Sequence, residues 1–402
     1  MNQEEIEKIR EHIPVTKEVA YLNNAAFGPT LQPVVDALNE FFHITHKFSP
    51  DSPHFWQWVP RQVGKTRTMV ASFVNAPVEG VCFVRTTTEG LNIVGFGLDY
   101  AERNEVILGD SQFEHTSIIL PWIRLQKQGV TVKTMKADEK GSYSVDNVQE
   151  LLTSKTKLVA FCHVPYNVGT LQPVKEIAKL CKDNGTLLLI DSAQCFGCIP
   201  LDFEKIGCDF MTFPAAMWMM GPQGIAFLVC SPEATEGMEP LNIGVATATL
   251  TPGGYELLPL PRRFEGGSLN YPSVYALQSA IQLAENTGIE NIGKRIRHLA
   301  DRLLKRLKNI DGITILGQEK AEQRNGIVAF DVGSVYPKAV MTMLDSFERV
   351  IISYKFIGDH MMIRSSVHYY NTEEEIDRLC DGLENILKDV HGRESSTYVK
   401  KK

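Results

Sequence analysis

Short apolar runs alternate with amphipathic stretches through the first two thirds of the chain. The runs are rich in β-branched and other large apolar residues, which is typical of buried strands. The stretches between several of them have helical spacing, as in residues 174–185, which end at an Asn-Gly stop. The runs that we interpret as strands are residues 82–85, 105–110, 130–135, 156–164, 186–191, 209–213 and 225–230.

Strands that alternate with helices predict an α/β fold with a mostly parallel central sheet. In such sheets, ligands bind at the carboxyl ends of the strands. A Gly/Pro-rich stretch, residues 251–267, interrupts the alternation and is interpreted as a long loop. Two long helices, residues 273–288 and 292–307, then introduce a smaller α+β domain. We therefore predict an N-terminal arm (1–20), a large domain (21–270), a small C-terminal domain (271–390) and a disordered tail (391–402).

Composition and charge narrow the range of partners. The formal net charge is -7, and acidic and basic residues are interspersed, so neither nucleic acid nor a membrane is an expected partner. The N-terminus is polar and acidic, unlike a signal peptide, and the cytoplasm is the expected compartment. Most of the eight cysteines lie in apolar runs and are expected to be reduced. Cys195 and Cys198 lack a second pair at zinc-ribbon spacing, so no metal site is predicted.

The strand at residues 186–191 ends in the sharpest chemical signal of the chain. Asp191 closes the strand, and Gln194 follows it. A carboxylate at a strand end can hold a proton on a heterocyclic nitrogen, and the glutamine can donate a hydrogen bond to a ring oxygen. Taken alone, Asp191 is equally compatible with a turn residue that caps the next helix.

Two upstream strand ends add candidate binding groups. Thr86, Thr87 and Thr88 follow one strand and open a helix, where hydroxyl and N–H groups suit a phosphate. His115 lies at another strand-to-helix junction, where an imidazole can stack on a flat ring. Each feature has a simpler interpretation when taken alone, as an ordinary helix cap or a histidine without a ligand.

In this order and spacing the motifs resemble those of the class V aminotransferase superfamily, which are pyridoxal-phosphate (PLP) enzymes of fold type I. This group includes cysteine desulfurase-like and isopenicillin N epimerase-like proteins. The resemblance includes YLNNAAFGP (21–29), RRFEGGSLNYPSVYAL (262–277) and MMIRSSVHYYNTEEEID (361–377), and it runs from about residue 20 to 390. It implies a large PLP-binding domain and a smaller C-terminal domain.

The resemblance implies a role for each candidate that binds the cofactor. Asp191 should face the pyridine nitrogen and Gln194 the phenolic oxygen, while His115 stacks on the ring. Thr87 and Thr88 should hold the phosphate.

The resemblance also implies a substrate site and a partner. Arg364 should bind the α-carboxylate of a small amino acid, as planar guanidinium geometry allows, and Asn24 should contribute to the same site. Ser268 should approach the cofactor phosphate of a second subunit, which implies a homodimer with shared active sites.

One position departs from the family in a way that affects the chemistry. Members carry a segment like S-x-H-K-W-x-x-G-P-x-G, in which the lysine forms a Schiff base with PLP. Aligning the W-x-x-G-P-x-G pattern at residues 218–224 places Met217 at the lysine position, Ala216 at that of the histidine and Pro214 at that of the serine.

Methionine can neither form an imine nor carry a proton. The site would then hold PLP noncovalently, hold pyridoxamine phosphate, or hold no cofactor. Three explanations stay open: an engineered substitution, a natural loss of the lysine, or replacement of its function by another base. His115, Lys355 and Tyr354 are the candidate bases, although Lys355 is also compatible with an ordinary surface lysine.

The reaction is predicted only as a class. Residues 353–366 contain no cysteine where cysteine desulfurases carry their nucleophile, so we expect a reaction other than desulfuration. Transamination, epimerisation and C–S or C–N lyase chemistry on a small amino acid remain. The alternative is a catalytically inactive, dimeric binding or scaffold protein. The aromatic segment 49–62 is expected to close over a substrate or to form a dimer interface.

Overall fold

A seven-stranded sheet forms the centre of the larger domain in a computed structural model that describes residues 1–399, with side chains to residue 389. Strands β7, β6, β5, β3 and β4 run parallel to one another, whereas β8 is antiparallel to both β7 and β2. The α/β fold with a mostly parallel sheet is thereby confirmed. The strand order is β2 (Val81–Val84), β8 (Ala226–Cys230), β7 (Phe210–Pro214), β6 (Leu187–Asp191), β5 (Thr156–Cys162), β3 (Glu105–Leu108), β4 (Thr131–Thr134).

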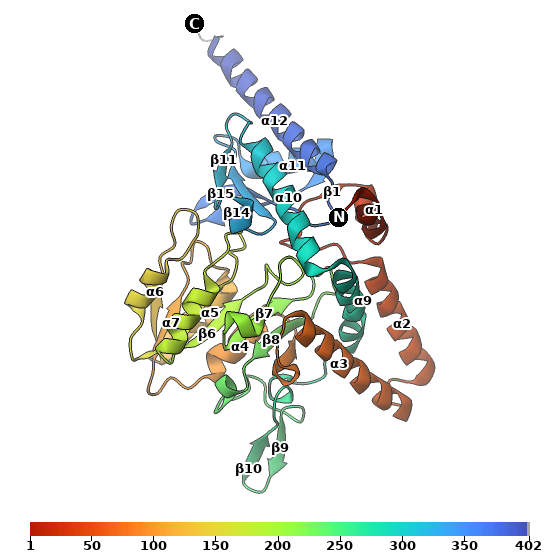
Figure 1. Cartoon of the computed structure of the whole chain (residues 1–402), viewed down its shortest axis with the longest axis vertical. Helices are drawn as coiled ribbons and strands as arrows, with labels where there is room; N and C mark the ends of the chain where they lie inside the picture. Colours follow the sequence, from red (N-terminus) through yellow and green to blue (C-terminus); the bar gives the residue numbers. More distant parts are fainter. Residues whose placement is uncertain (400–402) are drawn as a thin grey trace.

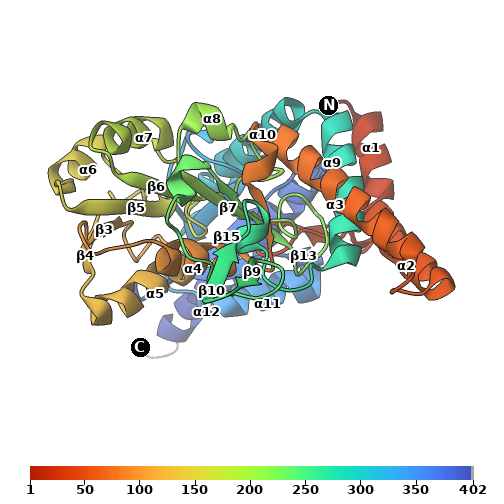
Figure 2. The ribbon, with the colours of Figure 1, turned by 90° about the horizontal axis from the view of Figure 1, so that it is seen from below.

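Helices cover both faces of this sheet, which explains why its central strands are apolar along their whole length. Figure 2 shows α6, α7 and α8 on one side of the strands and α4 and α5 on the other. Trp122 of α5 is fully buried in the second of these layers. The helices are α4 (Thr87–Gly97), α5 (Thr116–Leu125), α6 (Val145–Leu151), α7 (Val174–Asp183) and α8 (Phe203–Ile206).

Three long helices flank the sheet on one side: α2 (Gln32–Phe48), α3 (Pro53–Phe73) and α9 (Tyr271–Thr287). The aromatic segment 49–62, expected to be a loop, instead forms the α2–α3 turn and the first turns of α3. Ser52 caps this helix, because its side chain accepts a hydrogen bond from Phe55 N. Phe55 and Val59 are buried at helical spacing.

The smaller domain is built on a four-stranded antiparallel sheet (Figure 1). Its strands lie in the order β11 (Thr314–Leu316), β12 (Ile327–Asp331), β15 (His360–Ser366), β14 (Ser353–Ile357). The helices that form its apolar core are α10 (Ile289–Leu307), α11 (Pro337–Glu348) and α12 (Glu373–Val399).

The N-terminal residues that we expected to form an arm pack against both domains: Ile9 and Ile13 lie in the apolar core of the larger domain, whereas Ala20 lies in that of the smaller one. Strand β1 (Ala20–Tyr21) pairs with β13 (Val350–Ile351) in parallel. Helix α1 (Gln3–Glu11) is joined to α12 of the smaller domain by an ion pair of 2.8 Å between Arg10 and Glu375.

The apolar cores divide the chain at points other than the predicted boundaries. Residues of α9 and the start of α10 pack in the core of the larger domain, whereas Leu299 and later residues of α10 pack in that of the smaller one. The division therefore falls within α10 rather than at residue 270. Helix α12 continues to Val399, past the predicted start of a disordered tail, and residues 400–402 lie outside the described residues. Within residues 1–399, no helix is both long and apolar enough to cross a membrane.

The Gly/Pro-rich stretch is only partly a loop. Strands β9 (Ala248–Thr251) and β10 (Gly254–Leu257) form an antiparallel hairpin. Figure 1 shows this hairpin extending from the larger domain on the side opposite the smaller one.

Candidate functional site

The candidate residues gather where the carboxyl ends of β5 and β6 meet the sheet of the smaller domain. Asn23 forms a bridge with Ser366 at the end of β15. Arg364, on the same strand, donates a hydrogen bond of 2.7 Å to the carbonyl oxygen of Tyr166, in the loop after β5. These contacts fix the two domains against each other at the edge where parallel sheets bind ligands.

Asp191 is buried at the end of β6. We find one hydrogen bond to its carboxylate within residues 1–389, from Ala193 N to Oδ1 at 2.9 Å. Burial raises the pKa of Asp191 to about 6, although the bond from Ala193 acts in the opposite direction. A buried carboxylate with one engaged oxygen can accept a hydrogen bond from a protonated ring nitrogen at the other.

The side chain of Gln194 contacts that of Met217 near the carboxyl end of β6. Its side-chain nitrogen lies 3.2 Å from the carbonyl oxygen of Ala25 and 3.6 Å from the sulfur of Met217. Its side-chain oxygen accepts a hydrogen bond of 2.8 Å from the indole N–H of Trp218. The Met217 side chain therefore points to the turn that follows Asp191.

His115 is the N-cap of α5, where its Nδ1 accepts a hydrogen bond of 3.2 Å from Ser117 N. The ring packs edge-on against Tyr166, with 5.2 Å between ring centroids. Burial, and then the charge of Lys355, lower the pKa of His115, which keeps the imidazole neutral at pH 7. A neutral ring at this junction can stack on a flat ligand and accept a proton.

The threonine-rich turn lies beside His115. Thr86 caps α4 by accepting a hydrogen bond of 3.2 Å from Glu89 N. The Thr88 hydroxyl is 3.0 Å from that of Ser117 in the first turn of α5. The amino ends of α4 and α5 therefore adjoin each other, with Thr87 half-buried between exposed neighbours, which is a favourable position for an anion.

Arg364 is a buried guanidinium without a carboxylate partner. Only 1% of the residue is exposed, and none of the ion pairs within residues 1–389 includes it. It donates to Tyr166 O and, at 3.3 Å, to Asn23 Oδ1, while Nε has no partner. Burial lowers the pKa of Arg364 to about 10. An uncompensated buried cation is costly, so the geometry suits an anionic ligand.

Lys355 lies on the same face of the smaller sheet as Arg364. Arg364 is directly opposite Ser353 in the β14–β15 pair, and Lys355 follows two residues along β14. Lys355 is half-buried. Burial, and then the charge of Arg364, lower its pKa to about 8. The strand register therefore places Lys355 beside Arg364, and its role in a site stays a prediction.

Two predicted residues do not join this cluster. Asn24 is buried, but its side chain donates to Ser366 O at 3.0 Å and accepts from the Tyr370 hydroxyl at 2.9 Å. Its neighbour Asn23 is the asparagine that contacts Arg364. Ser268 is exposed and, with Arg85 and Glu89, lines a separate cavity of about 240 Å³. Its predicted role concerns a second subunit and stays a prediction.

The sequence analysis missed three residues of the site. Tyr166 contacts both His115 and Arg364. Glu114 is buried, accepts hydrogen bonds from the Tyr143 hydroxyl at 2.7 Å and Cys162 N at 2.9 Å, and has a pKa raised by burial to about 7. Asn167 binds Gln112 O and Phe356 O, joining the domains. Tyr166 and Asn167 lie just after a predicted strand, and this position is the sequence feature that could have identified them as candidate site residues.

Together, the mixed sheet, the strand-end aspartate and the second domain that supplies an arginine define the PLP-dependent fold type I class. The model of the family "Aminotransferase class-V" matches residues 20–379, so the chain belongs to this family. The resemblance inferred from the motifs is confirmed.

Curated relatives match almost the full chain. A probable cysteine desulfurase from Methanothermobacter thermautotrophicus is 33% identical over 394 residues, covering 94% of this chain and 98% of the relative. A cysteine desulfurase from Cronobacter sakazakii is 30% identical, covering 95% and 98%.

Solved structures show the same architecture. The apo cysteine desulfurase from Thermococcus onnurineus NA1 has a TM-score of 0.88 and 29% identity, with 95% of this chain and 98% of that chain covered. A C-DES mutant, in which a lysine is replaced by alanine and glycine is covalently linked to the PLP cofactor, has a TM-score of 0.86 and 25% identity, with 93% and 98% covered.

These relatives correct one prediction. We excluded the cysteine desulfurases because residues 353–366 contain no cysteine, and that exclusion is wrong, since relatives of that name match most of the chain. Residues 353–366 are a single hairpin, β14 and β15. Such a hairpin can change while the rest of the fold is retained, so it is a weak basis for excluding a group of relatives.

Proposed function

We propose that this protein binds PLP or pyridoxamine phosphate without a covalent bond to the chain, and binds a small amino acid beside it. The reaction class that we propose is C–S lyase chemistry, because relatives are named cysteine desulfurases. The observation that carries the proposal is Arg364, a buried guanidinium without a carboxylate, in the same interdomain site as the buried carboxylate of Asp191.

The residues present fit the cofactor. Asp191 would hold a proton on the ring nitrogen through the oxygen that Ala193 leaves free. His115 would stack on the ring, and Thr87 and Thr88 would bind the phosphate at the amino end of α4. When bound, PLP supplies an electron sink for negative charge that develops on the amino acid.

The position of Met217 supports a noncovalent mode of binding. Its sulfur lies beside Gln194, three residues after Asp191, which is consistent with the place where family members keep their lysine. A thioether offers neither an amine nor a proton, so proton transfer falls to His115, whose pKa is lowered by burial. We propose that the lysine is lost naturally; an engineered substitution at Met217 would leave the same pocket.

The proposal extends to a homodimer. Ser268 lies in the loop before α9, is exposed, and adjoins glycines on the wall of the 240 Å³ cavity. In a dimer, this loop would approach the phosphate site of the second subunit, as the family resemblance implies.

The test is an absorption spectrum of the purified protein with added PLP, repeated with each of a panel of L-amino acids. We expect bound PLP whose spectrum changes with an amino acid. Met217→Lys should create a bond to PLP that borohydride reduction makes permanent and mass spectrometry locates, whereas the control Met217→Leu should not.

The outcomes separate the alternatives. If PLP binds to neither the wild-type protein nor Met217→Lys, the proposed function fails and a scaffold without turnover is favoured. If PLP binds but Met217→Lys forms no bond, the placement of Met217 is wrong while the cofactor site stands.

A further inference from the structure

Lys355 is a second cation beside Arg364 that lacks a carboxylate partner. The charge of Arg364 acts on Lys355, and the phenols of Tyr166 and Tyr21 act on Arg364. None of them is a carboxylate. Within residues 1–389, no ion pair includes Lys355 or Arg364.

Other buried guanidinium groups in this chain are compensated. Arg67 is paired with Glu265 at 2.7 Å, and Arg295 is paired with Glu373. Arg324 has no carboxylate, but its guanidinium donates to backbone carbonyl oxygens from Nε and from both terminal nitrogens. Arg364 has neither a carboxylate partner nor such a full set of backbone acceptors: its Nε is buried without a partner, and a second cation lies nearby. Within residues 1–389, this part of the site therefore holds two cations that have no carboxylate partner.

The strand register places Arg364 and Lys355 close enough for one ligand to contact both side chains. Arg364 and Ser353 are directly opposite, so Lys355 is the diagonal neighbour of Arg364 on the same face. Diagonal neighbours in an antiparallel pair are roughly 7–8 Å apart at their backbones, within reach of two long side chains. One ligand can therefore contact both cations.

We propose that the site prefers an amino acid whose side chain carries a second carboxylate, a preference for which L-aspartate and L-glutamate serve as sulfur-free binding probes. This inference rests on the proposed function, because Arg364 then binds the α-carboxylate and leaves Lys355 for the side chain. A dianion compensates both cations, whereas a neutral amino acid compensates only one. A singly charged ligand leaves Lys355 half-buried and without a partner.

Asn167 holds the hairpin that carries Lys355. Its side-chain nitrogen donates to Gln112 O at 2.8 Å and to Phe356 O at 3.0 Å, which joins β14 to the loop before His115. The backbone next to Lys355 is thereby fixed against the larger domain. The strand that carries Lys355 is therefore held in place by the larger domain.

The experiment compares acidic ligands with their neutral isosteres by calorimetric titration of the PLP-loaded protein. L-aspartate is paired with L-asparagine, and L-glutamate with L-glutamine. We expect the acid of at least one pair to bind about tenfold more tightly or better, the scale of one charge-assisted contact.

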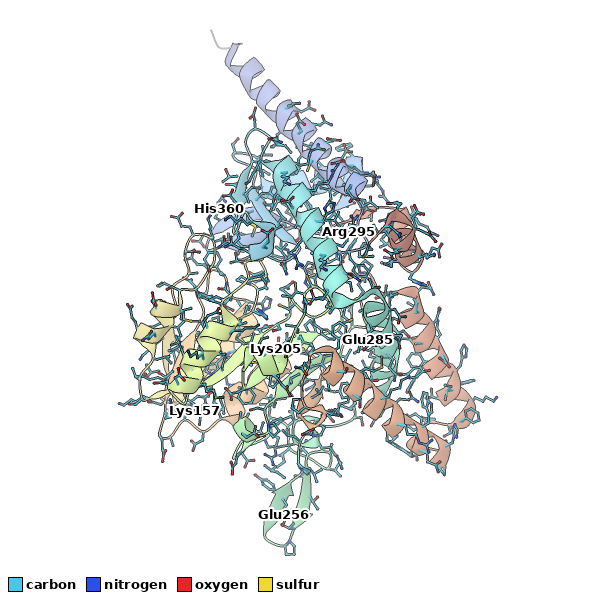
Figure 3. All side chains as sticks on the ribbon, in the orientation of Figure 1. Lys157, Lys205, Glu256, Glu285, Arg295 and His360 are labelled. Atoms are coloured by element: carbon cyan, nitrogen blue, oxygen red, sulfur yellow. The ribbon has the colours of Figure 1, made fainter. Side chains whose placement is uncertain are left out.

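The variants assign this preference to one side chain. Lys355→Gln should bring the acid and its amide to within about twofold of each other, while Lys355→Arg should retain most of the preference. Lys157→Gln is the matched control: Lys157 is half-buried at the amino end of β5, on the opposite edge of the sheet, as labelled in Figure 3. It should leave the preference unchanged. Circular dichroism confirms that each variant is folded.

The possible failures are distinct. If none of the four ligands binds, this inference is overturned, while the proposed function is decided separately by the PLP titration. If all bind with equal affinity, the proposed function stands and only the inference is overturned. An acid preference that survives Lys355→Gln would also overturn the assignment to Lys355.

Discussion

At the scale of single residues, the interdomain site contains two acidic side chains whose burial disfavours their charged form. Asp191 and Glu114 are both buried, and burial raises their pKa values to about 6 and about 7. Neither forms an ion pair within residues 1–389. A proton donor on a bound ring would relieve this cost at Asp191, so the residue serves ligand binding at the expense of stability.

Asp191→Asn should therefore have opposite effects on stability and on binding. Between about pH 4 and pH 6, folded Asp191 keeps a proton that the unfolded chain has lost, so its contribution to stability falls as the pH rises. In cofactor-free protein, the substitution should remove this loss and raise the free energy of unfolding by up to about 3 kcal/mol at pH 7. PLP affinity should fall sharply. Urea unfolding and a PLP titration measure the two effects; unchanged stability and affinity would contradict the assigned geometry.

Sequence motifs and structure agree on several residues and differ at the asparagines. Asp191, Gln194, His115 and Arg364 were predicted from motifs, and the structure places all four in the interdomain site. In YLNNAAFGP, however, two asparagines are adjacent, and a sequence cannot show which side chain faces Arg364. Backbone pairing with β15 decides that it is Asn23.

At the scale of elements, Glu265 holds the loop before α9 against the rest of the larger domain. Its two oxygens accept hydrogen bonds from the Arg67 guanidinium of α3 at 2.7 and 3.1 Å. The first oxygen also accepts from Phe83 N of β2 at 2.8 Å. This loop leads directly to Ser268, so the glutamate positions the segment that we propose to face a second subunit.

Glu265→Ala should destabilise the protein by about 3–5 kcal/mol, because it leaves the buried guanidinium of Arg67 without a carboxylate partner. Glu4→Ala is the control: it breaks an exposed pair with Lys8 and should cost at most about 1 kcal/mol. Chemical denaturation of both variants checks the difference. Equal losses would show that the buried pair contributes no more than the surface pair.

At the scale of the whole molecule, the β9–β10 hairpin and the segment before it expose many apolar side chains. Figure 3 shows Glu256 on this hairpin, away from both domain cores. Exposed apolar groups in one segment mark an interaction surface. They are Leu241, Ile243, Val245, Leu250 and Tyr255, with Val245 93% and Leu250 89% exposed.

We expect sedimentation analysis to give a homodimer, with this hairpin covered by the second copy. The double substitution Val245→Lys and Leu250→Lys should shift the protein towards monomer, because it places charges in an apolar contact. Phe347→Lys is the control, since Phe347 is 75% exposed on α11 in the smaller domain. A wild-type monomer would exclude the dimer, and a dimer unaffected by the double substitution would place its interface elsewhere.

Local patterns in the sequence were sufficient to predict the elements and the strand ends that carry chemistry. Apolar runs bounded by polar turns predicted the strands of the larger sheet, and Asp191 and His115 followed from their positions after such runs. These features depend on neighbours in sequence, because strand formation and helix capping are local. The departure at Met217 was likewise visible in the sequence.

Contacts between distant segments depended on the tertiary structure. The sequence left Lys355 open to an ordinary surface role, and only the pairing of β14 with β15 and the packing of that hairpin near His115 place it beside Arg364. The single antiparallel strand β8 and the division of the cores within α10 were decided in the same way. The physical reason is that burial and charge compensation depend on neighbours in space, which side-chain type and spacing do not specify.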